Sequence, residues 1–445
     1  MSRKDILNIL IIGGGGREHA IGWKVKQSLR CGELYFLPGN AGTATLGKNI
    51  PFLPPEWEAL PDLVRALGID LVIVGPELPL SEGVVDILRV AGIAVVGPTQ
   101  KAAQIETSKA FAKALMRDTG IPTAPFQIFD DFGRAKGYVR AKRRPFYIKA
   151  SGLAGGKGAF PCHTVSEAER VLHRLMEERE LGEAAEEVVV EEFLDGEEVS
   201  VHAFCHGNLC IMAPPTQDHK RLLADGECRA DGSNPNTGGM GAIGPVPWVS
   251  EEEILDMRDI VERTLRGVKG RTKEPFTGIL YPGLMMTAEG PKVLEYNVRG
   301  GDPETQVLMR LLSSDAVDLF EAMATGRLDT ITVWWPTGQF AVCITLAGRG
   351  YPEVPETGAL IDGIEEAEDL EGVVVFHAGT RNLHGHLQAN GGRVLSVTAT
   401  GQTLVGALAQ AYRAVDKICF DGMQYRKDIG RKAAAGRMEE TLASV

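Results

Sequence analysis

The sequence predicts an α/β protein with a Rossmann-like parallel sheet at its N-terminus, a mixed central part and a small α+β domain at its C-terminus. Three features predict this order. Short apolar runs alternate with helical patterns over the first 108 residues, as in a doubly wound sheet. Glycine-rich turns follow several of these runs, and short strands restart after Pro336. A length of 445 residues leaves room for about three domains.

The N-terminal segment is expected to form the parallel sheet. Its strands are predicted at residues 6–12, 33–37, 69–74 and 93–96. One helix is predicted to begin near Glu18. Another is predicted between the last two strands, where Ser81 is placed to cap its start and Gly92 to end it. Ligands of such sheets bind beyond the carboxyl ends of the strands, so the turns after these strands are expected to line a site.

The first turn, GGGGRE, could indicate a dinucleotide site. The G-x-G-x-x-G fingerprint needs a third glycine where this chain has Glu18, and no acid follows the second strand for a ribose hydroxyl. We therefore expect no NAD. A glycine-rich turn at a helix N-terminus still binds anions through free N–H groups, and Arg17 adds positive charge. A sugar phosphate is the expected ligand of this turn.

The central and C-terminal parts mix helices with strands. Ser108 is expected to cap a helix that Gly120 ends, and Lys149 lies on the strand that follows. Further helices are predicted at residues 165–180, 251–266, from 306 onward and at 403–417. Strands are predicted at residues 146–150, 188–192, 199–205, 278–286, 291–295, 340–345, 373–376 and 393–398. The last of these elements make up the small α+β domain.

Two features after Lys149 suit a nucleotide. SGLAGGKGAF, residues 151–160, is a glycine-rich loop whose backbone can approach phosphates. It is not a Walker A motif, because Gly158 follows Lys157 where Ser or Thr is required. The second feature is the strand at 188–192, which ends in an apolar pair with acids after it (EEFLDGEE). In that pattern, backbone groups could pair with the edge of a base, and an acid could bind the hydroxyls of a ribose.

The run EYNVRGGDPETQ, from Glu295 to Gln306, is the most informative part of the chain. Residues i and i+2 of a strand point to the same face, so Glu295, Asn297 and Arg299 are expected to project into one site. Oxygen ligands of these types suit magnesium, which takes few protein ligands beside substrate phosphates. An arginine next to that cation suits a carboxylate or a phosphoryl group in transfer. Taken alone, the run would equally fit a strand end with a surface salt bridge.

Composition excludes several classes of partner. A net charge of −12, a pI near 5.4 and the lack of a long basic cluster argue against nucleic acid. No apolar stretch reaches the ~20 residues of a membrane span, and the N-terminus lacks a signal-peptide cleavage site. Seven cysteines without a C-x-x-C pair fit reduced thiols. We therefore expect a cytoplasmic protein that does not bind a membrane.

Two histidines and two cysteines could suggest a zinc site. They are His202, Cys205, His206 and Cys210. The alternation of VSVHAFC indicates a strand that would place His202 and His206 on one face and Cys205 on the other. These side chains could then not close one tetrahedral site, and we expect ordinary strand residues.

Taken together, the motifs resemble those of the phosphoribosylamine–glycine ligases, the glycinamide ribonucleotide synthetase family of the ATP-grasp superfamily. The matching pieces run from residue 13 to residue 395 in family order. They are GGGGREHA, PGNAGT, VGPELPL, SKAF, GLAGGKG, EEFLDGEE, QDHKR, NPNTGGMGA, GILYPGLM, GDPETQ, FHAGT and GGRVL. The two N-terminal pieces and QDHKR argue against other ligases of this superfamily, such as carboxylases and dipeptide ligases.

The resemblance implies that ATP, glycine and 5-phosphoribosylamine give glycinamide ribonucleotide, ADP and phosphate through glycyl phosphate, an early step of purine synthesis. It implies magnesium (or manganese) at Glu295 and Asn297, and catalytic roles for Arg299, Lys220 and Asp302. The implied nucleotide-binding residues are Lys109, Lys149, Gly155, Gly156, Lys157, Gly158, Glu191, Glu192, Phe193, Leu194 and Glu198. The implied substrate-binding residues are Gly15, Gly16, Arg17, Asn40, Glu77, Asp218, Asn236 and Thr237.

The resemblance also implies a division into domains. A Rossmann-like domain is expected over residues 1–108, an ATP-grasp lid with the glycine-rich flap over 109–195, an ATP-grasp core with the metal site over 196–333, and the α+β domain over 334–430. The expected partners are these small molecules alone. A monomer and a dimer both fit.

Three positions depart from the family pattern. Gly300 stands where the family has a bulky Phe or Leu, Ser151 where it has Asp, and Asn234 where it has Gly. Loss of bulk at position 300 could widen the amino-acid pocket or loosen the loop of Arg299. We therefore expect weaker selectivity for glycine, which a restored Phe would sharpen, or a ligase specialised for another small amino acid. A catalytically silent nucleotide-binding homologue is a further alternative, although Glu295 and its neighbours are intact.

Overall fold

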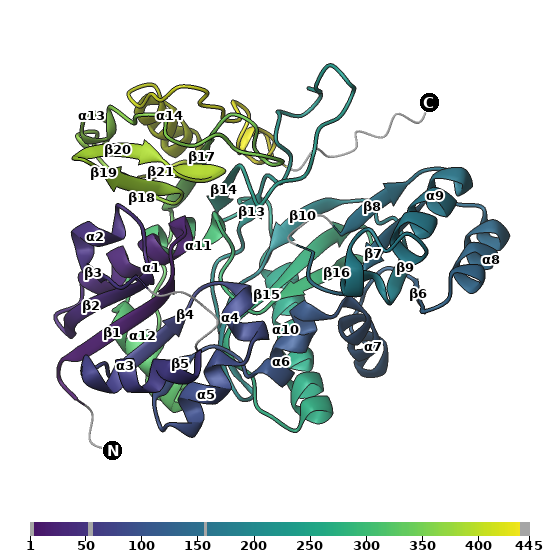
Figure 1. Ribbon diagram of the computed structural model, residues 1–445, viewed down its shortest axis with the longest axis horizontal. Helices are drawn as coiled ribbons and strands as arrows, with labels where there is room; N and C mark the ends of the chain where they lie inside the picture. Colours follow the sequence, from purple (N-terminus) through teal and green to yellow (C-terminus); the bar gives the residue numbers. More distant parts are fainter. Residues whose placement is uncertain (1–3, 52–56, 155–157, 437–445) are drawn as a thin grey trace.

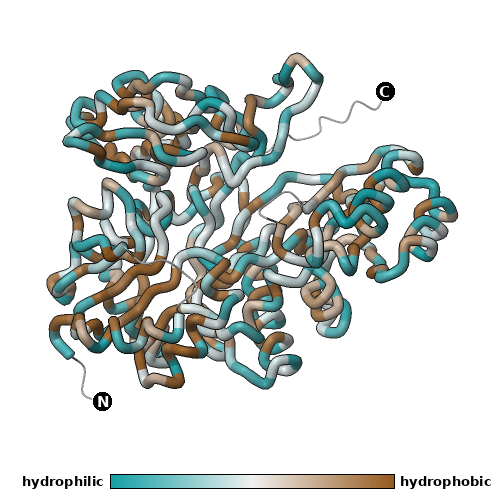
Figure 2. Tube along the Cα trace, viewed as in Figure 1, coloured by the Kyte–Doolittle hydropathy of each residue, from teal (hydrophilic) through white to brown (hydrophobic). Residues whose placement is uncertain are grey.

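The computed structural model describes residues 4–51, 57–154 and 158–436 (Figure 1). The N-terminal sheet lies at the lower left in purple, and the C-terminal sheet lies above it in yellow-green. A blue lobe projects to the right. Figure 2 shows hydrophobic stretches in brown along the strands of the N-terminal sheet. None of the described helices has the length and apolar composition that crossing a bilayer requires.

The N-terminal sheet is parallel and has the strand order β3-β2-β1-β4-β5. Its strands are β1 (Leu7–Gly13), β2 (Cys31–Pro38), β3 (Lys48–Asn49), β4 (Leu71–Val74) and β5 (Ala94–Val96). Its helices are α1 (Gly16–Lys26), α2 (Thr43–Leu46), α3 (Leu60–Ala66), α4 (Glu77–Ser81), α5 (Val84–Val90) and α6 (Gln100–Thr107). Leu10 and Ile12 enter one hydrophobic cluster and Ile9 and Ile11 another, because both faces of the sheet are covered. The predicted Rossmann-like arrangement is confirmed.

The prediction for Ser81 is wrong. Ser81 ends α4, and its hydroxyl donates a hydrogen bond to Leu78 O at 2.7 Å. The following helix, α5, begins after Gly83, whose φ of 80° favours glycine. Gly92 follows α5 as predicted. The helix α4 has only five residues, which is too short for a periodic pattern of apolar residues. The sequence therefore did not predict this helix.

The blue lobe is a four-stranded antiparallel sheet with the order β6-β9-β7-β8, covered by helices. Its strands are β6 (Phe126–Phe129), β7 (Phe146–Ala150), β8 (Ala159–Cys162) and β9 (Val188–Glu192). Its helices are α8 (Phe132–Lys142) and α9 (Val165–Met176), and α7 (Lys109–Thr119) precedes it. Phe146, Ile148, Leu172 and Val188 belong to its own hydrophobic cluster. Ser108 and Gly120 cap α7 as predicted, whereas α9 ends four residues earlier than predicted.

The central sheet has the order β10-β15-β11-β12, and β16 pairs with β15. Its strands are β10 (Glu197–Ser200), β11 (Ala203–His206), β12 (Leu209–Met212), β15 (Thr277–Thr287) and β16 (Gly290–Asn297). The helices of this part are α10 (Glu251–Thr272), α11 (Glu304–Leu311) and α12 (Ala316–Thr325). The single strand predicted at 199–205 is divided between β10 and β11. It is interrupted because His202 enters a buried cluster, where its Nε2 accepts a hydrogen bond from Gly301 N at 3.0 Å.

The C-terminal sheet has the order β13-β14-β17-β21-β18. Its strands are β13 (Gln217–Asp218), β14 (Gly241–Gly244), β17 (Phe340–Ala347), β18 (Val373–His377) and β21 (Arg393–Gly401). The smaller elements are the hairpin β19 (Thr380–Leu383) and β20 (His386–Ala389) and the helices α13 (Ile364–Glu368), α14 (Leu404–Val415) and α15 (Arg431–Ala434). The strands β13 and β14 precede the central helices in the chain but pair within the C-terminal sheet, so they connect this sheet to the central part of the protein.

Candidate active site

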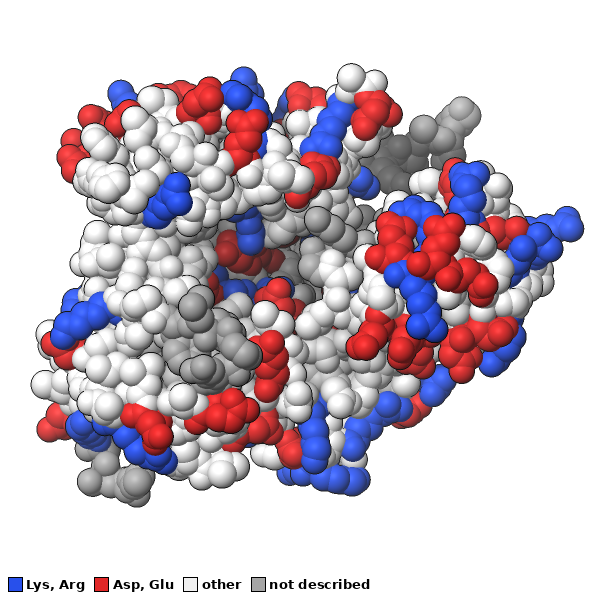
Figure 3. Space-filling view, in the orientation of Figure 1, with Lys and Arg blue, Asp and Glu red and all other residues white. Residues whose placement is uncertain are grey.

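A cleft of about 1630 Å³ lies where the lobes meet. Figure 3 shows acidic and basic side chains inside the hollow at this place. The predicted site residues that line it are Gly15, Arg17, Glu77, Lys109, Lys149, Gly158, Glu191, Glu192, Phe193, Leu194, Glu198, Asp218, Lys220, Asn236, Thr237, Glu295, Asn297, Arg299 and Asp302. Gly16 and Asn40 do not line it. The predicted residues Gly155, Gly156 and Lys157 lie outside the described part of the chain.

Glu295 and Asn297 stand at the end of β16 and line the cleft. Lys220 Nζ lies 3.5 Å from Glu295 Oε1. Lys220, acting with Lys149 and Lys109 against the effect of burial, lowers the pKa of Glu295 to about 2. The Glu295 side chain is 39% exposed. An ionised carboxylate beside an amide oxygen fits a magnesium ion held by few protein ligands and by phosphates.

Arg299 is held in place by two carboxylates. Its Nε donates to Glu77 Oε2 at 2.8 Å, and its Nη2 lies 3.4 Å from Glu106 Oε1. Burial would lower the pKa of the Arg299 guanidinium, but Glu106 and Glu77 raise it above its ordinary value. Nη2 also donates to Asn297 Oδ1 at 3.4 Å. Glu106, on α6, was missed by sequence reasoning because it lies just before the SKAF motif and its contact with Arg299 depends on the tertiary fold.

Two lysines that line the cleft, Lys113 and Lys149, share a buried carboxylate. Lys149 Nζ contacts Glu191 Oε1 and donates to Leu294 O at 3.4 Å. Burial lowers the pKa of Lys109. Lys113, one helical turn after Lys109, has its Nζ 2.5 Å from Glu191 Oε2. Sequence reasoning missed Lys113, although its i,i+4 spacing from Lys109 on one helix face was a usable signal.

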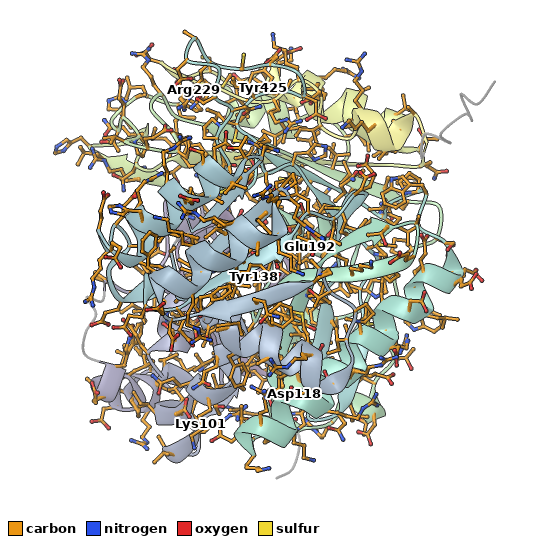
Figure 4. The ribbon with its side chains drawn as sticks, turned by 90° about the vertical axis from the view of Figure 1, so that its right-hand side faces the viewer. Lys101, Asp118, Tyr138, Glu192, Arg229 and Tyr425 are labelled. Atoms are coloured by element: carbon orange, nitrogen blue, oxygen red, sulfur yellow. The ribbon has the colours of Figure 1, made fainter. Side chains whose placement is uncertain are left out.

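The segment predicted to bind a base lies on the lobe that carries β9. The ring of Phe193 packs on Tyr147 with centroids 4.3 Å apart, and His163 lies 5.3 Å from the same ring. Glu192 forms an ion pair of 2.7 Å with Arg144. Figure 4 looks onto this lobe and labels Glu192. The predicted nucleoside segment therefore forms an aromatic wall of the cleft.

The sequence predicted free N–H groups at the first glycine-rich turn, but two of them are hydrogen-bonded to carboxylates. Gly15 N donates to Glu18 Oε2 at 2.7 Å, and Arg17 N lies 3.4 Å from Asp302 Oδ2. Arg17 Nη1 donates to Gly300 O at 2.9 Å. Because position 18 is glutamate and not glycine, its carboxylate caps the helix from within. A phosphate group at this turn would have to compete with two carboxylates.

Asn40 and Gly16 pack inside the protein. Asn40 Nδ2 donates to Gly14 O at 3.0 Å and to His377 O at 2.8 Å. Asn40 Oδ1 accepts bonds from Gly42 N and Thr43 N. Asn40 thus joins the glycine-rich turn to the C-terminal sheet. Gly16 is the first residue of α1, where an added methyl group would meet the Gln306 side chain.

The segment after β13 supplies another wall of the cleft. Lys220 Nζ contacts Glu198 Oε1, and this carboxylate and Glu295 raise the pKa of Lys220 against the effect of burial. Burial, followed by the charge of Glu304, raises the pKa of the Asp218 carboxyl group. Thr237 Oγ1 donates to Lys220 O at 2.9 Å. This wall therefore brings two groups with raised pKa values beside the end of β16.

Asp302 joins three parts of the molecule. Its Oδ1 accepts a hydrogen bond from Gln306 at 2.8 Å and lies 3.4 Å from Arg393 Nη1. Arg393, on β21, also donates to Gly238 O at 2.7 Å. Asp302 thus links the start of α1, the loop beside Asn236 and the C-terminal sheet. Sequence reasoning placed Asp302 in the site but missed Arg393, because the contact depends on the tertiary fold.

Two of the departures from the family pattern serve local structure. Ser151 Oγ accepts a bond from Ala110 N at 3.1 Å and lies 3.2 Å from Ser108 Oγ. Asn234 Oδ1 accepts a bond from Leu223 N at 3.0 Å, and its Nδ2 donates to Leu223 O at 3.1 Å. Ser151 therefore supports the start of α7, and Asn234 closes the loop after Lys220.

The third departure, Gly300, does not line the cleft. It borders a separate void of about 10 Å³ behind Arg17 and Arg299, which has room for about one water molecule. The other walls of this void are mainly apolar or glycine: Ile21, Ile73, Val74, Gly75, Val96, Gly97, Gly278, Ile279 and Val298. A methyl group on Gly300 would collide with Thr305 Oγ1. The space at position 300 therefore does not widen the cleft.

The four residues considered for zinc are dispersed. His202 is buried and its ring stacks on Tyr281, with centroids 4.3 Å apart. Cys205 and Cys210 face each other across the β11–β12 hairpin. His206 Nδ1 lies 2.8 Å from Met323 O. Within residues 4–51, 57–154 and 158–436, no three His, Cys, Asp or Glu side chains are grouped to hold a metal.

Family comparisons match the chain over nearly its whole length. The N domain of phosphoribosylglycinamide synthetase matches residues 7–106, its ATP-grasp (A) domain matches 107–305, and its C domain matches 341–432. The phosphoribosylamine–glycine ligase of Neisseria meningitidis serogroup A is 45% identical, over 96% of this chain and 99% of that protein. The trifunctional purine biosynthetic protein adenosine-3 of Gallus gallus is 44% identical over 96% of this chain, which spans 42% of that longer protein.

Solved structures agree with these matches. The crystal structure of phosphoribosylamine–glycine ligase from Thermotoga maritima has a TM-score of 0.80 at 33% identity, and covers 95% of this chain and 100% of that chain. The biotin carboxylase domain of 2-oxoglutarate carboxylase from Hydrogenobacter thermophilus has a TM-score of 0.72 at 15% identity, over 95% of this chain and 92% of that chain. The second likeness concerns the fold alone. On these grounds, the chain belongs to the phosphoribosylglycinamide synthetase family of ATP-grasp ligases.

Proposed function

We propose that this chain joins glycine to 5-phosphoribosylamine in de novo purine biosynthesis, consuming ATP and releasing glycinamide ribonucleotide, ADP and phosphate. The observation that carries the proposal is the convergence of Glu295, Asn297 and Arg299 on a cleft that Lys109 and Lys149 also line. Carboxylate activation by phosphoryl transfer needs this combination of an oxygen-ligand metal site, cations for the phosphates and an arginine for the carboxylate.

Glu295 and Asn297 are the residues that would hold magnesium or manganese. The cation, when bound, would neutralise charge on the phosphate groups of ATP. Lys109 and Lys149 stand where they can contact the transferred phosphoryl group. Arg299, fixed by Glu77 and Glu106, would orient the glycine carboxylate through its planar guanidinium.

The proposed chemistry has two steps. A carboxylate oxygen of glycine attacks the γ-phosphorus of ATP, so that ADP leaves and glycyl phosphate forms. The amine of phosphoribosylamine then attacks the acyl carbon, loses a proton and expels inorganic phosphate. We assign the second substrate to the side of the cleft that contains Arg17, Asp218 and Lys220, where a raised pKa suits Asp218 to hold a proton.

The proposed amino acid is glycine. Gly300 borders a void behind the cleft and not the cleft itself, so its small size provides no room for a larger amino acid. We also propose that the protein works in the cytoplasm on small molecules, which its seven free cysteines support.

A component-omission assay tests the proposal. Purified protein is given ATP, magnesium, fresh phosphoribosylamine and glycine, each is left out in turn, and ADP release and product mass are measured. We expect turnover only with all four components and a product with the mass of glycinamide ribonucleotide. Arg299→Lys should abolish turnover, whereas Arg170→Lys, at an exposed position of α9, should not. Faster turnover with alanine or serine than with glycine would overturn the proposal.

A further inference from the structure

Three charged side chains are buried together in one wall of the cleft. They are Lys113 of α7, Glu191 of β9 and Lys149 of β7, with side chains 3%, 2% and 9% exposed. Lys113 Nζ lies 2.5 Å from Glu191 Oε2, and Lys149 contacts the other oxygen, Oε1. One carboxylate is therefore shared by two lysines. Lysines and glutamates are almost never fully buried unless they are paired.

Further contacts fix Lys113 within this wall of the cleft. Its Nζ donates to Thr123 Oγ1 at 2.7 Å, and that hydroxyl donates to Val293 O at 2.6 Å. The same ammonium group lies 5.7 Å from the centre of the Phe126 ring. Through Thr123, Lys113 is connected to β16, the strand that carries Glu295. The position of Lys113 is thus set by the protein, and Lys149 is the lysine nearer to the metal-binding residues.

The balance of charge gives Lys113 a function. Glu191 and Lys149 alone would form a neutral pair, in which the carboxylate holds the lysine. A second lysine leaves the group with one net positive charge. Burial would raise the pKa of Glu191, but Lys149 and Lys113 lower it, so the carboxylate is ionised at neutral pH. With Lys113 in place, Glu191 keeps a partner when Lys149 turns toward a phosphate.

We propose that Lys113 is a positioning residue for nucleotide binding: it holds Glu191 and thereby leaves the charge of Lys149 available to the phosphates of ATP. This inference rests on the nucleotide-binding role proposed for Lys149. It assigns Lys113 no contact with the reacting atoms. It also predicts that the net charge of the group, and not the presence of a lysine at position 113, determines affinity for the nucleotide.

The test is calorimetric titration of ADP with magnesium, which requires no turnover. Lys113→Met leaves the neutral Glu191–Lys149 pair, so the variant should fold, and we expect its affinity for ADP to fall roughly 10- to 100-fold. The double variant Lys113→Met/Glu191→Gln restores one net positive charge. Its affinity should return to within about three-fold of the original. Lys136→Met, on helix α8 and outside the lining of the cleft, is the matched control and should bind as the original protein does.

If Lys113 had a purely structural role, the double variant should bind ADP weakly, because the double variant removes both members of a buried ion pair. Weak binding by both variants, or unchanged binding by Lys113→Met, would overturn the inference while leaving the proposed reaction intact. Failure of the unaltered protein to bind ADP would overturn both proposals. Thermal unfolding of each variant, measured alongside, separates loss of affinity from loss of folded protein.

Discussion

Replacing Glu295 by glutamine should change nucleotide binding in opposite directions with and without magnesium. With magnesium, the Glu295→Gln variant loses a charged ligand of the cation. Without magnesium, the same change removes a negative charge that competes with the phosphates for Lys220 and its neighbours. Asn297→Ala provides the matched control, because it removes an oxygen ligand without changing the charge.

The structure sets the size of both effects. The Lys220–Glu295 separation of 3.5 Å corresponds to a Coulomb energy of about 5 kcal/mol at an effective dielectric constant of about 20. The Glu295 side chain is 39% exposed, and solvent screening reduces such an interaction to about 1 kcal/mol. Metal-free ADP should therefore bind Glu295→Gln roughly five-fold more tightly. Loss of a direct ligand should weaken magnesium-dependent binding by at least about 100-fold, since loss of an outer-shell partner alone costs 10- to 100-fold.

Calorimetric titration of ADP in magnesium and in EDTA measures both effects on one protein. Asn297→Ala should weaken binding in magnesium and leave binding in EDTA unchanged. The pKa of Glu295 is about 2, so the difference between variant and original protein should be constant from pH 6 to pH 8. Weaker binding by Glu295→Gln in EDTA would refute the reasoning, because it would mean that the carboxylate does not oppose the phosphates.

Three further predictions concern stability and selectivity. Gly300→Phe should lower the free energy of unfolding by roughly 1–3 kcal/mol, because the new side chain clashes with Thr305. The preference of the enzyme for glycine over alanine should stay unchanged. A sharper preference would show that position 300 shapes the amino-acid pocket. Asn40→Ala should cost roughly 2–4 kcal/mol in urea unfolding, because four backbone groups lose their partner; an unchanged stability with a higher KM for phosphoribosylamine would instead make Asn40 a substrate ligand. Burial lowers the pKa of His202 from its ordinary 6.5 to about 4. As the pH falls, the unfolded chain therefore takes up a proton before the folded protein does, and the free energy of unfolding decreases by about 1.4 kcal/mol per pH unit between pH 6.5 and 4. Comparing the original protein with His202→Leu at pH 7 and pH 5 checks this, and an equal pH dependence of both would contradict it.

Elements with strong local signals could be predicted from the sequence. The helix α7 has both of its predicted caps, Ser108 and Gly120. The strand β9 has the predicted ends, and Glu295, Asn297 and Arg299, which alternate in EYNVR, do line one cleft. These features depend on neighbours within a few positions in the chain, which is why patterns of caps, apolar runs and period-two spacing were enough.

Features that depend on distant residues could not be predicted in this way. The N–H groups of the first turn were expected to be free, but that of Arg17 donates to Asp302, which comes from another part of the chain. His202 interrupts its strand because its partner is Gly301. Arg393 and Lys113 contact the site residues Asp302 and Glu191 across the fold. Short motifs carry no information about such partners, so the cleft could be outlined from the sequence but not completed.

Transfer of isotopic oxygen tests the central claim most directly. Glycine labelled with ¹⁸O in its carboxyl group is supplied with ATP, magnesium and phosphoribosylamine, and the released phosphate is analysed by mass spectrometry. Activation of the carboxylate as glycyl phosphate predicts one ¹⁸O atom in each phosphate released, because the acyl–oxygen bond breaks when the amine attacks. Phosphate that carries no ¹⁸O, released together with glycinamide ribonucleotide, would contradict the proposed route through glycyl phosphate.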